Sequence, residues 1–528
     1  MIIDWEQWLQ WHKERTYTTL PMLHKQPLVG LNSSTVASWE SAWQEAGPYS
    51  IVLESGKGGR YTYLGLQPVS VIQGKGESAM STEWVGQTAG QSAEWQGKPI
   101  DVVRRWMEPY VGPALHSGPK WTGGCAGFWS YDIIRSIERL PVLADDDLGL
   151  PDYVFMRFDE LWIVDREEGS LYCAVSTNVH ADLNERELRA CFEQALVRTE
   201  EMAALWTKLF GESQSAVEKV KLREQRQRML EEESLAVNVE AVKDTFSPFG
   251  RTAYEDAVRR IQQYIGQGDV FQVNLSLRQS KKAAVAAEEL YEWLRLVNPS
   301  PYMGFMRCPD FQLVSGSPEL LVELRDGLLA TRPIAGTRRR GQTAEEDAAM
   351  ERELLESEKE RAEHIMLVDL ERNDLGRISK YGSVHVKELM VIERYSHVMH
   401  LVSQVDGQIA DGKDAFDVIA ATFPGGTITG APKIRTMEII EELEPTRRGP
   451  YTGSLGWIDY CGNMEFNIII RTITVKDGVV HVQAGAGIVI DSIPEREYYE
   501  SLNKAKALWK AIGLSERFDN GIEGGEST

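Results

Sequence analysis

Short β-rich segments separated by glycine turns recur along this chain. Residues 49–75 alternate such segments with turns, and further strand-like runs follow, among them YVFMRFDELWIVD and FNIIIRTITVKDGVVHVQ. Strands joined by short turns predict hairpins and antiparallel pairing. Helical patterns lie in groups between the strands, at 344–366, 414–422, 432–443 and 495–512. This order favours an antiparallel α+β fold over a parallel, doubly wound one.

One stretch interrupts the β-rich pattern. Residues 182–243 are long, charged and helical in period, which indicates a helix followed by a solvated linker. We therefore expect an N-terminal domain over 1–235, a linker over 236–250 and a second domain over 251–512. Residues 513–528 show no obvious apolar anchors, and we expect them to form a mobile tail.

The charge of the chain limits its partners. The 528 residues carry a formal net charge of −22, which argues against binding to nucleic acid or to an anionic membrane, because both require a basic face. No run approaches the length of about 18 apolar residues that a transmembrane helix needs. The 5 cysteines lie far apart and predict free thiols in a reducing compartment. These features predict a cytoplasmic protein.

Two acidic clusters could bind a cation. Glu360 and Glu363 lie three residues apart, Glu497 and Glu500 repeat that spacing, and Lys504 follows Glu500 by four. Residues at such spacing share one face of a helix. Two helices that each present two carboxylates could hold a hard divalent cation, since Mg²⁺ takes one or two protein carboxylates and completes its shell with water or ligand. The alternative is a pair of solvent-facing acidic surfaces, with Glu500 and Lys504 a simple ion pair.

Several loops offer groups that suit an anion or a proton transfer. FPGGTITGAPKIR (423–435) and QAGAGIVIDS (483–492) contain small residues whose backbone can approach a ligand closely. Glu319 stands between a turn and an apolar strand, where burial could raise its pKa and make it a proton donor. The stretch TRPIAGTRRRG (331–341) gathers arginines in an otherwise acidic chain. Nucleotide, nicotinamide, serine-hydrolase and zinc-peptidase motifs are absent from the sequence.

These stretches occur in an order that resembles a known family. GDVFQVNLS, SPELLV, RPIAGTRRRG, ERAEHIMLVDLERNDLGR, FPGGTITGAPKIR and GAGIVIDSIPEREYYESLNKAKA are similar to the chorismate-utilising enzymes, almost continuously from 250 to 508. That family includes enzymes that form anthranilate, aminodeoxychorismate, isochorismate and salicylate. The resemblance implies an α+β fold in which antiparallel sheets form a sandwich with helices on the outside.

The resemblance also implies roles for particular residues. Mg²⁺ would be bound by Glu363 and Glu500, with Glu360 and Glu497 as further ligands and Lys504 beside them. Glu319 would protonate the departing hydroxyl group of the substrate, and His400 would lie by the ring. The remaining implied contacts to chorismate, a dianion, come from Ala335, Thr337, Thr427, Tyr451, Arg471, Gly485 and Gly487.

Gln272 bears on the nucleophile. The water-using members of the family have a general-base lysine where this chain has Gln272, which cannot deprotonate water. Ammonia needs no such base. The resemblance therefore implies an aminating enzyme that receives ammonia from a glutaminase subunit, either its own or one shared with an anthranilate synthase, because the chain has no recognisable glutaminase segment.

Ala335 bears on the product. One group of aminodeoxychorismate synthases has a lysine there that attacks C2 of chorismate, whereas alanine is the anthranilate-synthase pattern. FPGGTITGAPK, MEFNIIIRT and LEPTRRGPYTG instead resemble the aminodeoxychorismate enzymes of Bacillus type, which also carry PIAGT. The sequence thus favours component I of an aminodeoxychorismate synthase of the 4-aminobenzoate and folate route. Anthranilate synthase component I, which aminates C2 and releases pyruvate, is the alternative.

A second small-molecule site is implied near the N-terminus. Glu54, Ser55, Pro301 and Tyr302 correspond to the tryptophan pocket of related enzymes. The alternative is that these residues only pack a strand and a turn in the core.

Overall fold

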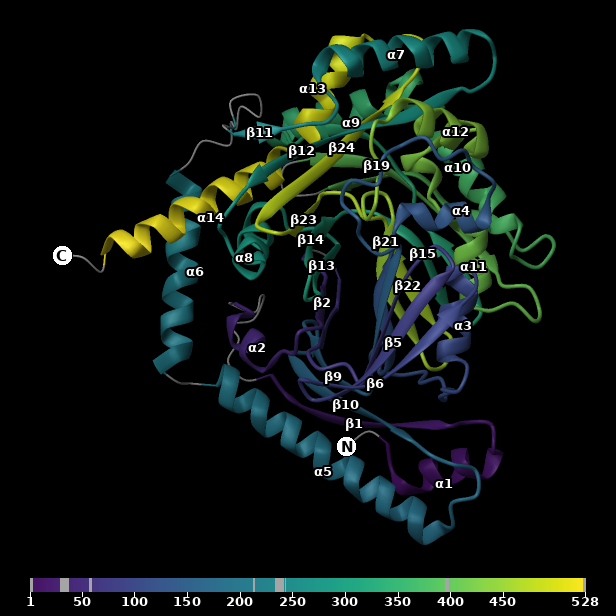
Figure 1. Ribbon diagram of the computed structural model, residues 1–528, viewed down its shortest axis with the longest axis vertical. Helices are drawn as coiled ribbons and strands as arrows, with labels where there is room; N and C mark the ends of the chain where they lie inside the picture. Colours follow the sequence, from purple (N-terminus) through teal and green to yellow (C-terminus); the bar gives the residue numbers. More distant parts are fainter. Residues whose placement is uncertain are drawn as a thin grey trace.

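A computed structural model of the chain describes residues 3–28, 38–56, 59–211, 214–232, 242, 244–394 and 398–525, apart from the side chains of 214–220 and 520–525. Two sheets of 12 strands each form its centre (Figure 1). Every strand pair within them is antiparallel, which confirms the predicted fold class.

Both sheets combine strands from the two halves of the chain. In spatial order, the first contains β1 (Thr19–Pro27), β10 (Ser170–Asn178), β9 (Glu160–Asp165), β3 (Tyr61–Gly65), β2 (Ser50–Glu54), β13 (Tyr302–Arg307), β14 (Phe311–Ser317), β23 (Thr472–Lys476), β24 (Val479–Ile488), β12 (Gln272–Lys282) and β11 (Thr245–Phe246), with β20 (Gly430–Ala431) also on β12. The second contains β17 (Ile334–Arg339), β19 (Val398–Gln408), β16 (Leu328–Thr331), β15 (Leu320–Arg325), β22 (Met464–Asn467), β21 (Ser454–Asp459), β7 (Gly124–Trp129), β8 (Tyr153–Phe158), β4 (Ser70–Lys75), β5 (Ser78–Val85) and β6 (Thr88–Gln96), with β18 (His385–Arg394) also on β19. The two domains that we predicted on either side of residues 236–250 therefore contribute strands to both sheets. Strand β11 lies near the end of the predicted linker. Residues 236–241 and 243 lie outside the described residues.

Aromatic side chains fill the space between the sheets. Phe128 of β7 meets Phe311 of β14 edge to face, with 5.8 Å between ring centroids. Tyr63 of β3 lies 6.3 Å from Trp457 of β21, and Trp457 stacks on Trp121 at 5.9 Å. Such inward-facing contacts define a β-sandwich, as the resemblance implied.

Helices cover the outer faces of the sandwich (Figure 1). Helices α5, α7, α8 and α13 pack on the first sheet, and α3, α9, α10 and α11 pack on the second. The helices are α1 (Trp5–Glu14), α2 (Glu40–Glu45), α3 (Pro99–Met107), α4 (Ile134–Ile137), α5 (Glu185–Phe210), α6 (Gln214–Glu232), α7 (Arg251–Gly266), α8 (Ala287–Val297), α9 (Ala344–Glu356), α10 (Glu358–Gly376), α11 (Ala415–Thr422), α12 (Lys433–Leu443), α13 (Pro494–Lys504) and α14 (Lys506–Gly525), and a 3₁₀ turn, η3, spans Gly426–Ile428.

Two of the hairpins follow directly from local chemistry. Asp477 and Gly478 join β23 to β24 with φ values of 50° and 71°, and Asp326 and Gly327 join β15 to β16 with 50° and 80°. Two central residues with positive φ form a type I′ turn, whose twist matches that of the flanking strands. Aspartate and glycine are residue types that tolerate this conformation.

Three helical predictions need correction. The helix expected over 344–366 is two helices, because Ser357 turns the chain and its side chain accepts a hydrogen bond from the Glu360 amide at the start of α10. The helix expected over 495–512 likewise divides into α13 and α14. The prediction that 513–528 lacks apolar anchors is wrong, since α14 runs to Gly525 and buries Leu514 and Phe518. Phe518 packs edge to face on Trp293. Residues 526–528 lie outside the described residues.

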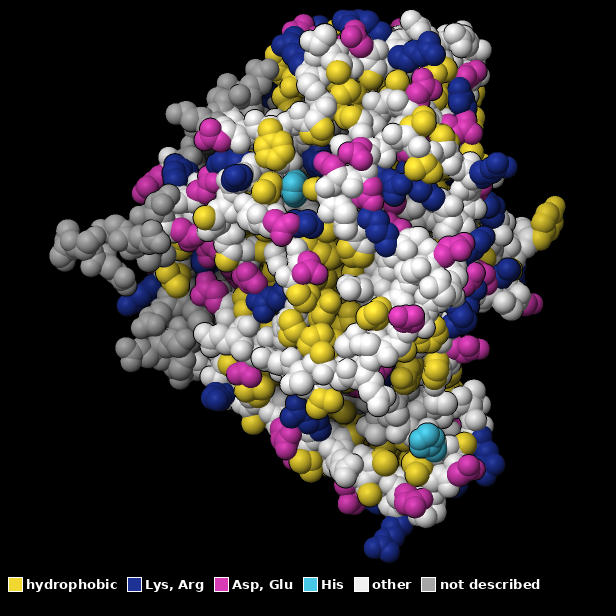
Figure 2. Space-filling model, viewed as in Figure 1, with side chains coloured by type: hydrophobic (Ala, Val, Ile, Leu, Met, Phe, Trp, Pro, Cys, Tyr) yellow, Lys and Arg dark blue, Asp and Glu magenta, His cyan; other side chains and the backbone are white. Residues whose placement is uncertain are grey.

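The surface and the cysteines agree with an ordinary globular chain. Acidic and basic side chains are interspersed over the face seen in Figure 2. No helix among the described residues is both long and apolar enough to cross a membrane. The 5 cysteines are free thiols, as predicted, and three of them are buried.

Candidate active site

The small residues predicted to approach a ligand lie on β24 beside β12. Asn274 of β12 pairs with Gly487, and Ser276 pairs with Gly485. A Cβ atom on Gly487 would lie 2.3 Å from Nε2 of Gln272, and one on Gly485 would lie 2.7 Å from Oδ1 of Asn274. A side chain at 487 would displace the end of the Gln272 side chain, whereas glycine is required at 485, because a Cβ atom there would also lie 2.6 Å from the Leu275 carbonyl oxygen.

Glu319 is a buried carboxyl group that is protonated at neutral pH. It lies between β14 and β15 with 6% of its surface exposed. Burial is the largest effect and raises its pKa to about 8; Thr427 opposes burial, the negative charge of Glu371 acts in the same direction as burial, and Lys504 has a smaller opposing effect. A carboxyl group with this pKa can donate a proton at pH 7, the role expected from the sequence.

Thr337, His400, Tyr451 and Arg471 form a second group of the predicted residues. The Thr337 hydroxyl lies 3.0 Å from Nδ1 of His400. The pKa of His400 is lowered to about 4, mainly by burial and also by the charge of Arg471, so the ring is neutral. Burial lowers the pKa of Arg471, while the nearby Tyr451 raises it. Among the described residues, none forms a hydrogen bond or ion pair with the Arg471 guanidinium.

Arg471 is half-buried and its guanidinium lacks an ion pair within the described residues, so its charge is open to a ligand. Arg471 also has a φ of 52°, in the left-handed region that costs free energy for a residue with a side chain. Both features suit a group that waits for an anionic ligand.

The arginines of the 331–341 stretch have a different role. Arg338 pairs with Glu353 and Glu360, which lie on helices α9 and α10. Arg332, Arg339 and Arg340 likewise form ion pairs with carboxylates of β18 and α9. These contacts fix strand β17 against its neighbours, whereas Ala335 in its centre stays partly exposed.

The four glutamates predicted to bind a metal influence one another. Burial raises the pKa of Glu363, and the charges of Glu360, Glu500 and Glu497 raise it further, against an opposing effect of Lys359. Mutual repulsion of this kind shows that the acidic faces of α10 and α13 lie close together, although the two helices are far apart in sequence. A divalent cation between them would relieve the repulsion.

The carboxylates of α10 and α13 do not form a closed coordination site. In the described ranges, no three or more His, Cys, Asp or Glu side chains lie close enough together to hold a metal ion. Lys504 occupies part of this region, since its ammonium group donates to the Gly485 carbonyl oxygen and pairs with Glu500, both at 3.0 Å. Because Mg²⁺ needs only one or two protein carboxylates, this donor set still fits that ion.

Four buried polar atoms near the glycines and Glu319 have no hydrogen-bond partner within the described residues. They are Oε1 of Glu319, Oγ1 of Thr427, Oε1 of Gln272 and Oδ1 of Asn274. Buried polar atoms are normally satisfied, so atoms left open together indicate a place where a polar ligand binds. Asn274 was not predicted. The alternation of FQVNLS places it on the same face of β12 as Gln272, which is the signal that could have identified it.

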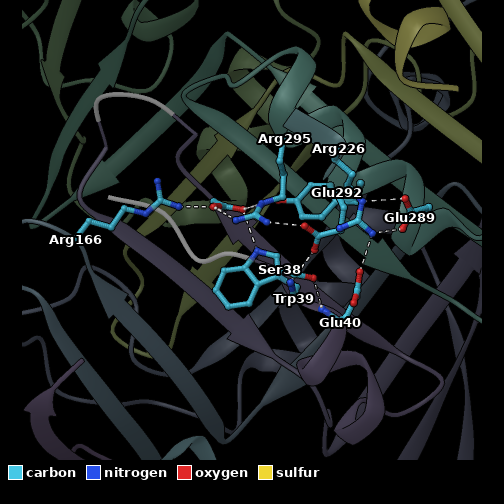
Figure 3. A network of polar contacts seen from close by, with 10 residues as sticks. Ser38, Trp39, Glu40, Arg166, Arg226, Glu289, Glu292 and Arg295 are labelled. Carbon is cyan, nitrogen blue, oxygen red and sulfur yellow. Dashed lines mark hydrogen bonds and ion pairs between the residues drawn. The ribbon is translucent and has the colours of Figure 1, made fainter. Parts of the chain in front are cut away.

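The residues predicted to form a tryptophan pocket line a separate cavity. Glu54, Ser55, Pro301 and Tyr302 surround it together with residues of β21 and β22, including Trp457. Beside this cavity lies a buried network of charges that links β2 to helices α6 and α8 (Figure 3).

Glu54 is the member of that network that faces the cavity. Burial acts to raise its pKa, but Arg295 and Arg166 outweigh that effect and lower it to about 2. Arg295 also pairs with Glu292, whose carboxylate accepts a hydrogen bond from the Trp39 backbone amide. The ionised carboxylate at the wall of the cavity is thus held in place from two sides.

Comparison with known proteins connects these features to a family. The sequence model of the chorismate binding enzymes matches residues 49–510. The chain is 47% identical to aminodeoxychorismate synthase component 1 of Bacillus subtilis over 89% of this chain and 92% of that protein. It is 42% identical to anthranilate synthase component 1 of Acetivibrio thermocellus over 87% and 89% of the two chains. The crystal structure of anthranilate synthase component I from Streptococcus pneumoniae superposes with a TM-score of 0.64, at 32% identity, and covers 85% of this chain and 92% of that one.

Proposed function

Because this chain belongs to the family of chorismate-binding enzymes, we propose that it is component I of an aminodeoxychorismate synthase. In this role it replaces the C4 hydroxyl group of chorismate by an amino group and keeps the enolpyruvyl group. The observation that carries the proposal is the combination of a protonated buried carboxyl group, Glu319, with an unpaired guanidinium, Arg471. Chorismate is a dianion that loses a hydroxyl group, so its site needs a positive charge for a carboxylate and a proton for the departing hydroxyl group.

The chain's own residues would divide the work as follows. Arg471 and Tyr451 bind a substrate carboxylate, and the backbone at Gly485 and Gly487 allows a second close approach. Glu319 donates its proton to the C4 hydroxyl group, which leaves as water. The incoming ammonia forms the new C–N bond and then loses one proton, which balances the proton that Glu319 gave.

The acidic faces of α10 and α13 are the proposed magnesium site. Glu363 and Glu500 would hold the ion, with Glu360 and Glu497 close by. When bound, Mg²⁺ would supply positive charge that neutralises a substrate carboxylate otherwise repelled by these side chains. Addition of Mg²⁺ to the protein should raise its melting temperature, and E363Q and E500Q should remove that shift. An unchanged shift in both variants contradicts this assignment.

Ammonia is the nucleophile that the site favours. Gln272 is not basic, and its Oε1 atom and the Oδ1 atom of Asn274 are acceptors that could receive N–H groups. The partner we propose is a glutaminase subunit that releases ammonia from glutamine in the cytoplasm. Turnover with glutamine should require that subunit, whereas turnover with ammonium salts should not.

Identification of the product tests the proposal. Incubation with chorismate, Mg²⁺ and ammonium should yield a compound that an added lyase converts to 4-aminobenzoate. Release of pyruvate with fluorescent anthranilate would instead establish the second candidate, anthranilate synthase component I. Ala335 favours that candidate, because it carries no nucleophile that could form a covalent bond to C2.

The second cavity is proposed to bind tryptophan. Its aromatic walls suit an indole ring, and Glu54 could receive the α-ammonium group. Isothermal titration with tryptophan should give saturable binding that E54Q abolishes while chorismate binding persists. Binding that is equally tight in E54Q contradicts this placement.

A further inference from the structure

The stretch LERNDLGR in the second half of α10 places charged groups beneath Glu319. Glu371 and Asp374 follow Glu360 by 11 and 14 residues, close to whole numbers of helical turns, so they continue the face that carries Glu360. Glu371 is 5% exposed and Asp374 is 2% exposed. Lys433, at the start of α12, forms an ion pair with Asp374. Two carboxyl groups and one ammonium group are thus buried together.

Glu371 holds both segments that act on the Glu319 carboxyl group. Its Oε2 atom accepts a hydrogen bond of 2.8 Å from the Thr331 hydroxyl, and the Gly426 amide is close enough to lower its pKa. Ile334 follows Thr331 by three residues, and Thr427 directly follows Gly426; both Ile334 and Thr427 lower the pKa of Glu319. One carboxylate therefore joins the end of β16 and the η3 turn at the place where they meet the proton donor.

The packing around this carboxylate leaves little room for movement. A Cβ atom on Gly426 would lie 2.1 Å from the side chain of Leu370, the residue before Glu371. Helix α10 therefore contacts the η3 backbone directly, so that a displacement of Glu371 would also displace the turn that carries Thr427.

We propose that Glu371 is a positioning residue for the reaction: it anchors the segments of Thr331 and Gly426 around Glu319, and its negative charge keeps the proton on Glu319. This inference rests on the proposed function, in which Glu319 is the proton donor. Glu371 does not contact the substrate in this scheme.

The charges around the two carboxyl groups support the electrostatic part. Burial raises the pKa of Glu371, the charge of Asp374 acts in the same direction, and Lys433 opposes both effects. The charge of Glu371 in turn raises the pKa of Glu319. Besides Glu371, the charged group that acts on Glu319 is Lys504 of α13, with the opposite effect.

The pH dependence of kcat/KM tests the proposal. A proton donor is active below its pKa, so wild-type activity should fall as the pH rises through about 8. The variant E371Q keeps the shape of the side chain but not its charge, so the pKa of Glu319 should fall and this alkaline limb should move down by roughly 1 pH unit. T331V and E371D keep the charge; their limb should stay in place, while kcat falls about threefold to tenfold from lost positioning.

The control is D369N, which removes a charge from the same helix at a side chain that is 62% exposed. Its limb should not move. An E371Q limb at the wild-type pH would overturn the electrostatic part, and wild-type kcat values in both T331V and E371D would overturn the positioning part. If E371Q does not fold, the kcat values of T331V and E371D still decide the positioning part, and the smaller apolar substitution E371A, read by the same alkaline limb, decides the electrostatic part.

An infrared titration separates this inference from the proposed function. The carbonyl band of protonated Glu319, identified by its loss in E319Q, should disappear at lower pH in E371Q than in the wild type, whether or not chorismate is turned over. Absence of turnover by the wild type with a shifted band would reject the proposed function alone. Turnover with an unshifted band would reject the role of Glu371 alone.

Discussion

Replacement of Arg471 by glutamine should change substrate affinity and protein stability in opposite directions. The guanidinium is partly exposed at the site, has no partner among the described residues and has its pKa lowered by burial. In the free protein the unpaired charge lowers the free energy of unfolding, whereas in the complex it binds a substrate carboxylate. Most arginines that form ion pairs, such as Arg448 with Glu444, should behave differently, because their replacement removes a native contact.

The magnitudes follow from these contacts. A hydrogen bond to a charged group contributes about 1.5–3 kcal/mol, so loss of a bidentate contact should cost at least ~3 kcal/mol. This corresponds to an increase of roughly 150-fold in KM for chorismate. Removal of the unpaired charge should stabilise the free protein by ~1 kcal/mol, a value kept small because water still reaches the side chain.

Steady-state kinetics and urea unfolding of the free protein measure the two effects. R471K keeps the charge but not the planar fork, so its KM should rise only about tenfold. R372Q is the matched control, since Arg372 is 51% exposed and, within the ranges that the structure describes, forms an ion pair with Asp369 alone; it should change neither quantity. A KM within threefold of the wild type in R471Q, or a loss of stability greater than ~1 kcal/mol, would refute the reasoning.

Three further predictions concern stability. The pKa of Glu319 is about 8 in the folded protein and 4.5 ordinarily, so the unfolded chain binds fewer protons and stability falls as the pH rises between these values. Urea unfolding at several pH values measures this dependence. In E319Q the unfolding free energy should decrease with pH less steeply than in the wild type, by about 1.4 kcal/mol per pH unit. F518A should lose ~3 kcal/mol because Phe518 is buried on Trp293 at 5.6 Å, whereas F246A, at a side chain that is 56% exposed, should stay within ~0.5 kcal/mol of the wild type. E54Q should lower the unfolding free energy by ~3 kcal/mol, because the buried Arg166 and Arg295 then lose the carboxylate that both contact. The wild type should show the same loss only as the pH falls towards the Glu54 pKa of about 2.

Local features of this fold could be read from short stretches of sequence. The Asp-Gly pairs at 326–327 and 477–478 mark two hairpins, because aspartate and glycine tolerate the positive φ that the turns require. The helix of residues 185–210 begins at Asn184, whose side chain caps it together with Glu187. The division of 344–366 at Ser357 was missed, since a serine within a helical pattern is compatible both with a continuous helix and with a new start.

The strand order was beyond such reasoning. Strand β2 pairs with β13, which lies about half the chain away, and β7 pairs with β21 from near the other end. Hydrogen bonds between backbones carry no sequence label, so which strands meet depends on how all the apolar faces can be buried at once. For the same reason, the two halves of the chain did not separate into two bodies at 236–250.

The sequence by itself determined which residue types the site contains and how they are spaced. The carboxylates of α10 and α13, the glycines of β24 and the motif around Glu319 were all identified from it, because spacing along one helix or strand is a local property. Only the tertiary structure decided their chemical state. Burial raises the pKa of Glu319 to about 8, the Arg471 guanidinium has no ion pair among the described residues, and Glu371 lies beneath both segments around Glu319. A pKa depends on the solvent and charges that surround a group in space, and these come from parts of the chain far away in sequence.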